Sequence, residues 1–326
     1  PRRRSRPPRR AVTVLPSATR FSTVRNGLAE SIHDTSVFAI NAAGNELYRS
    51  GDPDRPLFYR SAVKPLQATV ALEAGLELPP EHVAVACASH GGWPVHISIV
   101  RRMLHEAGLD EDALQCPAVW PLSQEARDLQ LRRGVRAARR IFHNCSGKHA
   151  AMLAACVARG WPIDSYLNPD HPLQQAIVEV VTEATGIRPE PVGIDGCGAP
   201  TMRGSVRGLA TAFAQLSSDP RYERAASAVS RFPSLAADNR RADGWLARWW
   251  GGPVKVGAQG QIGISRHHIG IAAKATAGEG EVAVAAIIAA ADDLGLLPDA
   301  MRSGLAGVAA PPVLGGGVPV GELARS

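Results

Sequence analysis

Lysine is rare in this chain, and most of its lysines lie beside residues that can do chemistry. Only four lysines stand among the 36 basic residues, and three of them belong to short runs rich in serine, cysteine or glycine. Ser61 precedes Lys64 by three positions, Cys145 precedes Lys148 by three, and Lys255 is followed by Val-Gly-Ala. A desolvated ammonium can lose its proton and act as a base or a metal ligand, whereas a guanidinium stays protonated. The pattern indicates lysines that serve where arginine cannot.

Ser61 and Lys64 are predicted to begin a helix, where side chains three positions apart share a face. A neutral lysine amine can take the proton of the serine hydroxyl and make that hydroxyl nucleophilic. Ser89 follows a short apolar run and Lys255 lies on a predicted late strand, which completes an ordered set typical of serine acyl-transfer enzymes. The alternative is structural, with Ser61 as a helix cap and Lys64 on the surface.

The run Cys145-x-x-Lys148, together with Cys197, has two interpretations. Thiolates are soft donors that suit zinc, but the regular four-ligand spacing of a structural zinc site is missing. A metal site built from these residues would leave a position for water or substrate. The alternative is that both cysteines are small buried apolar residues, and the spacing alone favours this alternative.

In their order along the chain, these motifs closely resemble the rhizobial-type L-asparaginase family, also called asparaginase II or class 3. The runs that carry the resemblance span about residues 24 to 294, and they are residues 24–33, 60–67, 86–90, 143–154, 193–201 and 255–258. The resemblance implies an α/β fold, with a mixed sheet flanked by helices, similar to serine β-lactamases and glutaminases. It also implies a homodimer.

The resemblance further implies the residues of the site. The catalytic residues would be two serine–lysine tandems, Ser61 with Lys64 and Ser89 with Lys255. One zinc ion per chain, not strictly required for folding, would be held by Cys145, Lys148 and Cys197, which reverses the preference drawn from spacing. The substrate-binding residues would be Arg60, His90, Gly257 and Ala258.

The function that follows is an amidohydrolase that cleaves the side-chain amide of L-asparagine to L-aspartate and ammonia. Two alternatives stay open. One is a related amidase or glutaminase of altered specificity, and the other is a catalytically weak homologue that binds a ligand or a metal. The sequence motivates the first alternative because it departs from the family pattern at three places, namely Trp93, Gln259 and residues 275–278. Losing a carboxylate near the site would weaken recognition of the substrate's α-ammonium group or alter lysine pKa values.

The composition is that of a globular protein, with 45% hydrophobic and 20% charged residues. The net charge of +6 comes from six arginines in the first ten residues, so the rest of the chain is formally neutral. We therefore expect a disordered basic arm over residues 1–20, a catalytic domain over residues 21–326 that forms one unit or two closely packed lobes, and no nucleic-acid partner. No apolar run is long enough to span a membrane, and five cysteines without a disulfide pattern favour a cytoplasmic protein.

The elements that must position the motifs can be read from periodicity and from helix-ending glycines. A hairpin is predicted over residues 35–49, helices over residues 61–74, 95–107, 147–159, 171–185, 204–216, 221–231 and 281–294, and strands over residues 83–88, 253–258, 261–264 and 268–274. Residues 194–200 are predicted to be irregular. Residues 311–317 are predicted to form a loop, followed by at most one edge strand.

Overall fold

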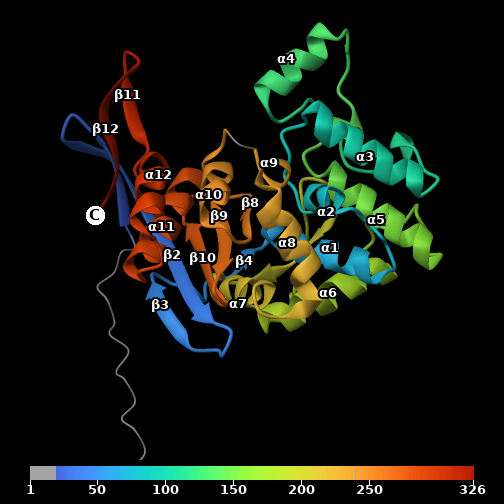
Figure 1. Cartoon of the computed structure of the whole chain (residues 1–326), viewed down its shortest axis with the longest axis horizontal. Coiled ribbons are helices and arrows are strands. Elements are labelled where there is room, and N and C mark those ends of the chain that lie inside the picture. Colours follow the sequence, from blue (N-terminus) through green and yellow to red (C-terminus); the bar gives the residue numbers. More distant parts are fainter. Residues whose placement is uncertain (1–19, 239) are drawn as a thin grey trace, which may run out of the picture.

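A sheet of eight strands runs through the molecule, and helices cover both faces of its central strands (Figure 1). The structure is a computed structural model that describes residues 20–238 and 240–326. The strand order is β11-β12-β1-β2-β10-β9-β8, with β3 paired to β2, and each of these pairings is antiparallel. The strands are β1 (Arg20–Arg25), β2 (Leu28–Asn41), β3 (Glu46–Ser50), β8 (Val254–Gly257), β9 (Gln261–Arg266), β10 (Ile269–Ala275), β11 (Pro312–Gly315) and β12 (Val318–Arg325). The predicted α/β fold class is confirmed.

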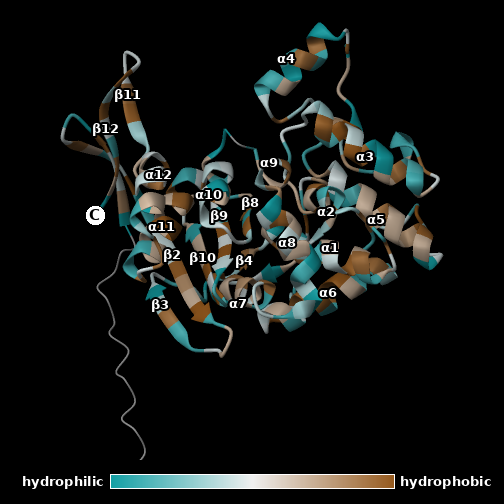
Figure 2. Cartoon of the chain, in the orientation of Figure 1, coloured by the Kyte–Doolittle hydropathy of each residue, from teal (hydrophilic) through white to brown (hydrophobic). Residues whose placement is uncertain are grey.

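Alternation along the central strands explains why both faces are covered. Successive side chains of a strand point to opposite faces. In β2, Phe38 belongs to one hydrophobic cluster, whereas Val37 and Ala39 belong to another. Ala272 and Ile271 divide in the same way on β10, and Figure 2 shows hydrophobic colour along both strands. A sheet that is apolar on both faces must be packed between two layers of helices.

The two layers of helices differ in size. One face is covered by α10 (Ala242–Trp250), α11 (Gly280–Asp293) and α12 (Asp299–Ala309). The other is covered by α7 (Val206–Leu216), behind which lies a larger helical layer (Figure 1). This layer holds α1 (Lys64–Glu73), α2 (Pro80–Ala86), α3 (Pro94–Glu106), α4 (Gln124–Arg132), α5 (Ser146–Arg159), α6 (Pro172–Thr185), α8 (Glu223–Arg231) and α9 (Pro233–Ala236).

Short elements connect these layers. They are the strand pairs β4 (Leu57–Phe58) with β7 (Arg203–Gly204) and β5 (Gly193–Ile194) with β6 (Pro200–Thr201), and the 3-10 turns η1 (Arg60–Val63), η2 (Glu111–Ala113), η3 (Arg140–Phe142) and η4 (Pro220–Tyr222). Helix α7 lies very close to the sheet. A Cβ atom added at Gly270 would come within 2.0 Å of the Ala210 carbonyl oxygen, so only glycine allows this approach.

Most predicted helices are confirmed, but two predictions about elements were wrong. Residues 83–88 were expected to form a strand, whereas residues 80–86 form helix α2. A short apolar run does not distinguish a buried strand from a buried helix, and Pro80 at the helix start with Glu81 in the first turn was the stronger signal. The expected loop at residues 311–317 instead contains β11, and the hairpin with β12 turns at Gly316 and Gly317, both with positive φ.

The termini and the cysteines complete the description. Arg20, the last residue of the expected basic arm, is the first residue of β1, and the rest of the arm lies outside the described residues. In the part of the chain that the structure describes, no helix has the length and apolar character to cross a membrane. All five cysteines are buried and free.

Candidate active site

The Ser61 segment lies at the meeting point of the sheet and the helical layer. Tyr59 is fully buried and donates its backbone N–H to the Met202 carbonyl oxygen at 2.9 Å. Arg60 follows with a left-handed φ of 49°, which turns the chain into η1 and then into α1. Ser61 is half-buried within η1 and does not cap α1, contrary to the structural alternative. Its hydroxyl makes no hydrogen bond with any described residue, so it is free to meet a substrate.

Ser89 is the meeting point of two buried lysines. Lys64 Nζ donates to Ser89 Oγ at 3.2 Å, to Cys145 Sγ at 3.3 Å and to the carbonyl oxygen of Ala88. Lys255 lies on strand β8 of the sheet, and its Nζ donates to the same Ser89 Oγ at 3.1 Å. The spacing of Ser61 and Lys64 suggested a direct pair. Lys64 Nζ instead donates to three other acceptors. One of them is Ser89 Oγ, which also contacts Lys255, so Ser89 connects the two expected serine–lysine tandems.

Burial has a chemical consequence at Lys255. Desolvation, and then the positive charge of Lys64, lower the pKa of Lys255 to about 7. An ordinary lysine has a pKa near 10.4 and is fully protonated in neutral water. Lys255 is therefore neutral in a large fraction of molecules near neutral pH. A neutral amine in contact with a serine hydroxyl can accept that hydroxyl's proton.

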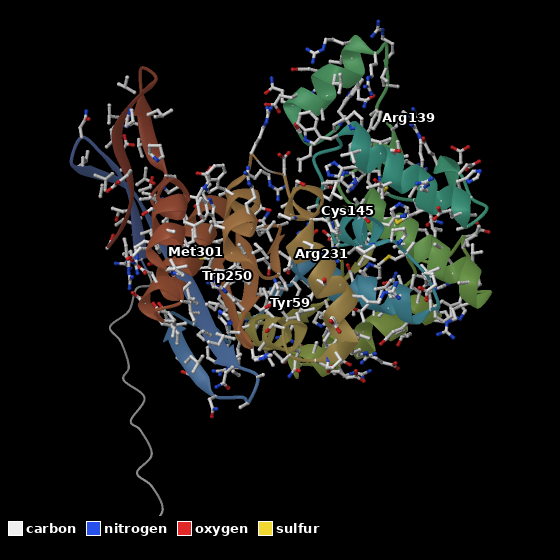
Figure 3. The ribbon with its side chains drawn as sticks, in the orientation of Figure 1. Tyr59, Arg139, Cys145, Arg231, Trp250 and Met301 are labelled. Carbon is white, nitrogen blue, oxygen red and sulfur yellow. The ribbon has the colours of Figure 1, made fainter. Side chains whose placement is uncertain are left out.

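The second cluster lies beside the first, inside the helical layer, where Figure 3 labels Cys145. Lys148 Nζ donates to Cys197 Sγ at 3.2 Å, and Cys145 and Cys197 are hydrogen-bonded to each other. That hydrogen bond, with the nearby ammonium of Lys64, outweighs burial and lowers the pKa of Cys145 well below its usual range. Burial opposes a charge on Lys148, but the sulfur atoms of Cys197 and Cys145 prevail and raise its pKa.

The three expected zinc ligands thus converge, although Lys148 has an unusual donor type. Among the described residues there is no group of three histidine, cysteine or acidic side chains placed to hold a metal. Two soft sulfur donors and one amine nitrogen, all buried, still form a donor set that fits zinc once the thiols and the ammonium are deprotonated.

A salt bridge connects the serine segment to the cysteine segment. Arg60 Nε donates to Asp195 Oδ1 at 2.5 Å, and the same oxygen accepts the Gly196 backbone N–H at 2.7 Å. Arg60 N also donates to Thr201 Oγ1 at 3.1 Å. Because Asp195 is two residues before Cys197, these bonds fix the turn that carries the thiol against the segment that carries Ser61.

A hollow of about 520 Å³ opens above the first cluster, and Ser61, Ser89, Gly257 and Ala258 line it. A Cβ atom at Gly257 would come within 2.7 Å of the Tyr59 carbonyl oxygen, so the glycine keeps the Lys255 strand close to the serine segment. Two other expected substrate-binding residues lie elsewhere.

Arg60 lines a neighbouring hollow of about 240 Å³. His90 is fully buried, accepts the Gly92 N–H, shares a 3.0 Å hydrogen bond with Ser146 Oγ, and stacks on His96, so it does not line the main hollow. A role for His90 in binding substrate therefore has no support from this geometry.

The departures from the family pattern occupy different places. Gln259 lines the main hollow, with a left-handed φ of 65° in the turn between β8 and β9. Trp93 does not line this hollow, and its ring lies 5.6 Å from the guanidinium of Arg240.

Several lining residues were not predicted from the sequence. Arg241 and Asp243 form a two-point ion pair, with distances of 2.9 and 2.6 Å, in the turn that leads into α10, and Asn144 and Glu281 also line the hollow. The sequence signal for the pair was an Arg-x-Asp run at the start of a mostly apolar helix. Asp243 is buried, which is rare for a carboxylate without a partner.

Comparison with known proteins identifies the family to which the chain is similar. A model of the family L-asparaginase II matches residues 21–325. Similar solved structures include Mglu in its glutamate form (TM-score 0.46, 16% identity, covering 85% of this chain and 66% of that chain). They also include a Bacillus glutaminase (0.46, 13%, 80% and 91%) and a β-lactamase from Sphaerobacter thermophilus (0.39, 14%, 82% and 93%). These TM-scores lie below 0.5, so the likenesses carry no weight for function. A search of curated proteins gave no match.

The family match defines the class of protein, an amidohydrolase that acts on a small-molecule substrate. The chain belongs to the L-asparaginase II family, because the family match extends over nearly its whole length. The resemblance seen in the motifs is thereby confirmed.

Proposed function

We propose that this protein hydrolyses the side-chain amide of L-asparagine to L-aspartate and ammonia. The observation that carries the proposal is the Ser89 hydroxyl, which lies 3.1 Å from Lys255 Nζ and 3.2 Å from Lys64 Nζ at the base of the hollow that Ser61 lines. Family membership supports the reaction class, and ionic side chains around the hollow suit an amino-acid substrate.

In the first half of the reaction, the Ser61 hydroxyl would attack the amide carbon. Its proton would pass to Lys64 in the neutral form, which this amine takes once its own proton has moved through Ser89 Oγ to Lys255. Lys64 would then return a proton to the nitrogen as the C–N bond breaks and ammonia leaves. In the second half, water would attack the resulting ester, and Ser61 would regain its proton as L-aspartate leaves. The free hydroxyl of Ser61 supports its assignment as nucleophile.

Ser89 and Lys255 would act beside this pair. Among the described residues, Lys64 Nζ makes no hydrogen bond with the Ser61 hydroxyl, although the Lys64 backbone N–H donates to the Ser61 carbonyl oxygen. Proton transfer between the two side chains would therefore need a small side-chain movement or a bridging group of the substrate. The hydroxyl of Ser89 bridges Lys64 to Lys255, whose pKa of about 7 allows it to give and take a proton near neutral pH. The same two groups can donate to the oxyanion of the tetrahedral intermediate, an interaction that usually contributes most to the rate.

Ser89 is a second candidate for the acylated residue. Its hydroxyl already contacts two lysine nitrogens, which is the contact that activates a serine. Ser61 is the less engaged and the more accessible of the two, and this supports Ser61 as the residue that is acylated. Both serines contribute under either assignment, so the two assignments are separated by finding which serine carries the ester.

Zinc belongs to the proposal as a binding partner, at one ion per chain. Cys145, Lys148 and Cys197 would hold it, and the ion would supply a Lewis acid able to polarise an oxygen atom next to the site. The salt bridge between Arg60 and Asp195 connects the segment that carries Cys197 to the segment that carries Ser61. Because the hydrophobic core is extensive, we do not expect the metal to be needed for folding.

One assay tests the function against its alternatives. Purified protein would be given L-asparagine, L-glutamine and a set of neutral amides, and released ammonia would be measured. The proposal predicts preference for L-asparagine. Preference for glutamine or a neutral amide would favour the altered-specificity alternative. No ammonia from any amide would favour a ligand-binding or metal-binding homologue.

The homodimer and the cytoplasmic location are predictions of the same proposal. The family resemblance motivates the first, and five free cysteines motivate the second. Sedimentation equilibrium of the purified protein would test the dimer, and fractionation of cells would test the location.

A further inference from the structure

The main hollow carries four ionic side chains among its described lining residues, and three of them are already paired. Arg241 and Asp243 bind each other through both carboxylate oxygens. Arg241 also reaches the Ser89 carbonyl oxygen at 3.4 Å, so this pair helps to position the catalytic segment. Arg240 forms an ion pair with Glu125 of α4. Neither arginine and neither of these carboxylates is available without breaking an existing bond.

Glu281 is the exception. It lies in the first turn of α11 and lines the same hollow as Ser61, yet its carboxylate makes no hydrogen bond or ion pair with any described residue. An acidic residue at a helix N-terminus is common, because it interacts favourably with the helix dipole. That role does not require the side chain to line an active-site hollow. Gln259, which lines the hollow too, offers only a neutral amide.

We propose that Glu281 binds the α-ammonium group of the amino-acid substrate and so makes the enzyme select α-amino acids over other amides. The inference rests on the proposed function and names a specificity residue for it. An α-ammonium brings a positive charge and three N–H donors into the hollow, and a carboxylate without another partner is a strong acceptor for it. Asp243 is closed to this task by Arg241, and Glu281 is open.

The inference predicts a change in specificity for Glu281→Gln, which keeps the shape and removes the charge. KM for L-asparagine should rise on the order of 10-fold, at the low end expected for a charge-assisted bond because Glu281 is exposed. KM for succinamate, which is asparagine without its α-ammonium, should stay unchanged. The matched control is Glu279→Gln, two residues earlier, whose carboxylate lies 3.4 Å from His33 and does not line the hollow. Its kinetics should equal those of the unaltered enzyme.

A charge relocated within the hollow should restore selection. The double variant Gln259→Glu with Glu281→Gln returns one carboxylate to the same hollow from the β8–β9 turn. We expect KM for L-asparagine to recover by several-fold relative to Glu281→Gln, with no change for succinamate. Equal effects on both substrates, or none on either, would overturn the inference.

A binding measurement decides the matter independently of turnover. Calorimetry would compare L-aspartate with succinate, which differ only in the α-ammonium, on the unaltered protein and on Glu281→Gln. The inference predicts tighter binding of L-aspartate to the unaltered protein and loss of that preference in the variant. If the protein releases no ammonia but shows this difference in binding, the proposed function is wrong and the ammonium site at Glu281 stands. If the protein is active but shows no such difference, the proposed function stands and the ammonium site is wrong.

Discussion

Lys255 and Lys148 lie in neighbouring clusters of one protein interior, and each contacts a possible reaction partner at hydrogen-bond distance. Lys255 Nζ lies 3.1 Å from the Ser89 hydroxyl oxygen, and the Nζ of a second lysine, Lys64, lies 3.2 Å from the same oxygen. Lys148 contacts the Cys197 sulfur at 3.2 Å, with a second cysteine beyond it. Both side chains are buried to a similar degree. Burial disfavours the charged form in both places, so any difference must come from the partners.

The partners set opposite protonation states. The charge of Lys64 adds to desolvation and lowers the pKa of Lys255 to about 7, whereas the sulfur atoms overcome desolvation and raise the pKa of Lys148. One cluster thus offers a neutral amine suited to moving protons. The other cluster holds a protonated Lys148 beside two sulfur atoms, and a metal ion can bind there when it displaces the protons from these groups.

The largest effect should come from the hydroxyl that the first cluster serves. Ser61→Ala should lower kcat for ammonia release by about 10³-fold or more, because alanine has no hydroxyl to attack the amide carbon. Ser230→Ala, which removes a hydroxyl bonded only to the Ala226 carbonyl oxygen, is the control and should keep full activity. A Ser61→Ala enzyme that retains a tenth of the activity would exclude Ser61 as nucleophile.

Charge without a mobile proton should not suffice in the first cluster. Lys64→Arg should lower kcat by about 10²- to 10⁴-fold, since a guanidinium keeps its proton. Lys274→Arg tests the same exchange outside the cluster and should have little effect on turnover. Steady-state kinetics and a thermal melt of both variants separate lost chemistry from lost folding. Near-normal turnover in Lys64→Arg would contradict the proposed base.

The pH dependence of activity should report Lys255. Because its pKa is lowered to about 7, protonation below that pH removes the neutral amine, so kcat/KM should fall as pH decreases through about 7. The profile should be level above pH 8 until another group titrates. Lys255→Arg should lower activity and remove this inflection, because arginine does not titrate there. An unchanged inflection in the variant would assign it to a different group.

The second cluster should show smaller effects on turnover and larger effects on metal. Cys197→Ser should weaken zinc binding by at least about 100-fold, since a hydroxyl is a poorer donor than a thiolate for this ion. We expect KM for L-asparagine to rise in this variant, while its melting temperature changes little. Cys156→Ser, at a buried thiol of α5 outside the cluster, is the matched control and should retain zinc. Elemental analysis that finds no zinc in protein prepared without chelator would count against the metal site.

The sequence predicted which residues form the site better than how they contact each other. The spacing of Ser61 and Lys64 indicated a serine–lysine pair, but helical geometry alone could not reveal that Lys64 turns toward Ser89. That choice depends on the long-range packing of η1 against β8, which no local pattern contains. Residues 83–88 show the same limit, because an apolar run of that length fits a buried strand as well as the helix that forms.

The charged residues that line the hollow were even harder to predict from the sequence. Arg241, Asp243 and Glu281 lie far from the serine motifs in sequence, and each has an ordinary local explanation at the start of a helix. Only the folded chain places them around Ser61. The helix ends at Gly160 and Gly186 were predictable, because a glycine in the left-handed conformation is a local signal.

The most direct test of the account is to trap the covalent intermediate. Enzyme mixed with excess L-asparagine would be quenched in acid within one turnover and digested, and the peptides that contain Ser61 and Ser89 would be examined by mass spectrometry. The account predicts an aspartyl ester on Ser61 that is absent in Ser61→Ala. At a pH above the pKa of Lys255, this ester should form at least as fast as ammonia is released. Steady ammonia release with neither serine ever esterified would contradict a serine–lysine mechanism.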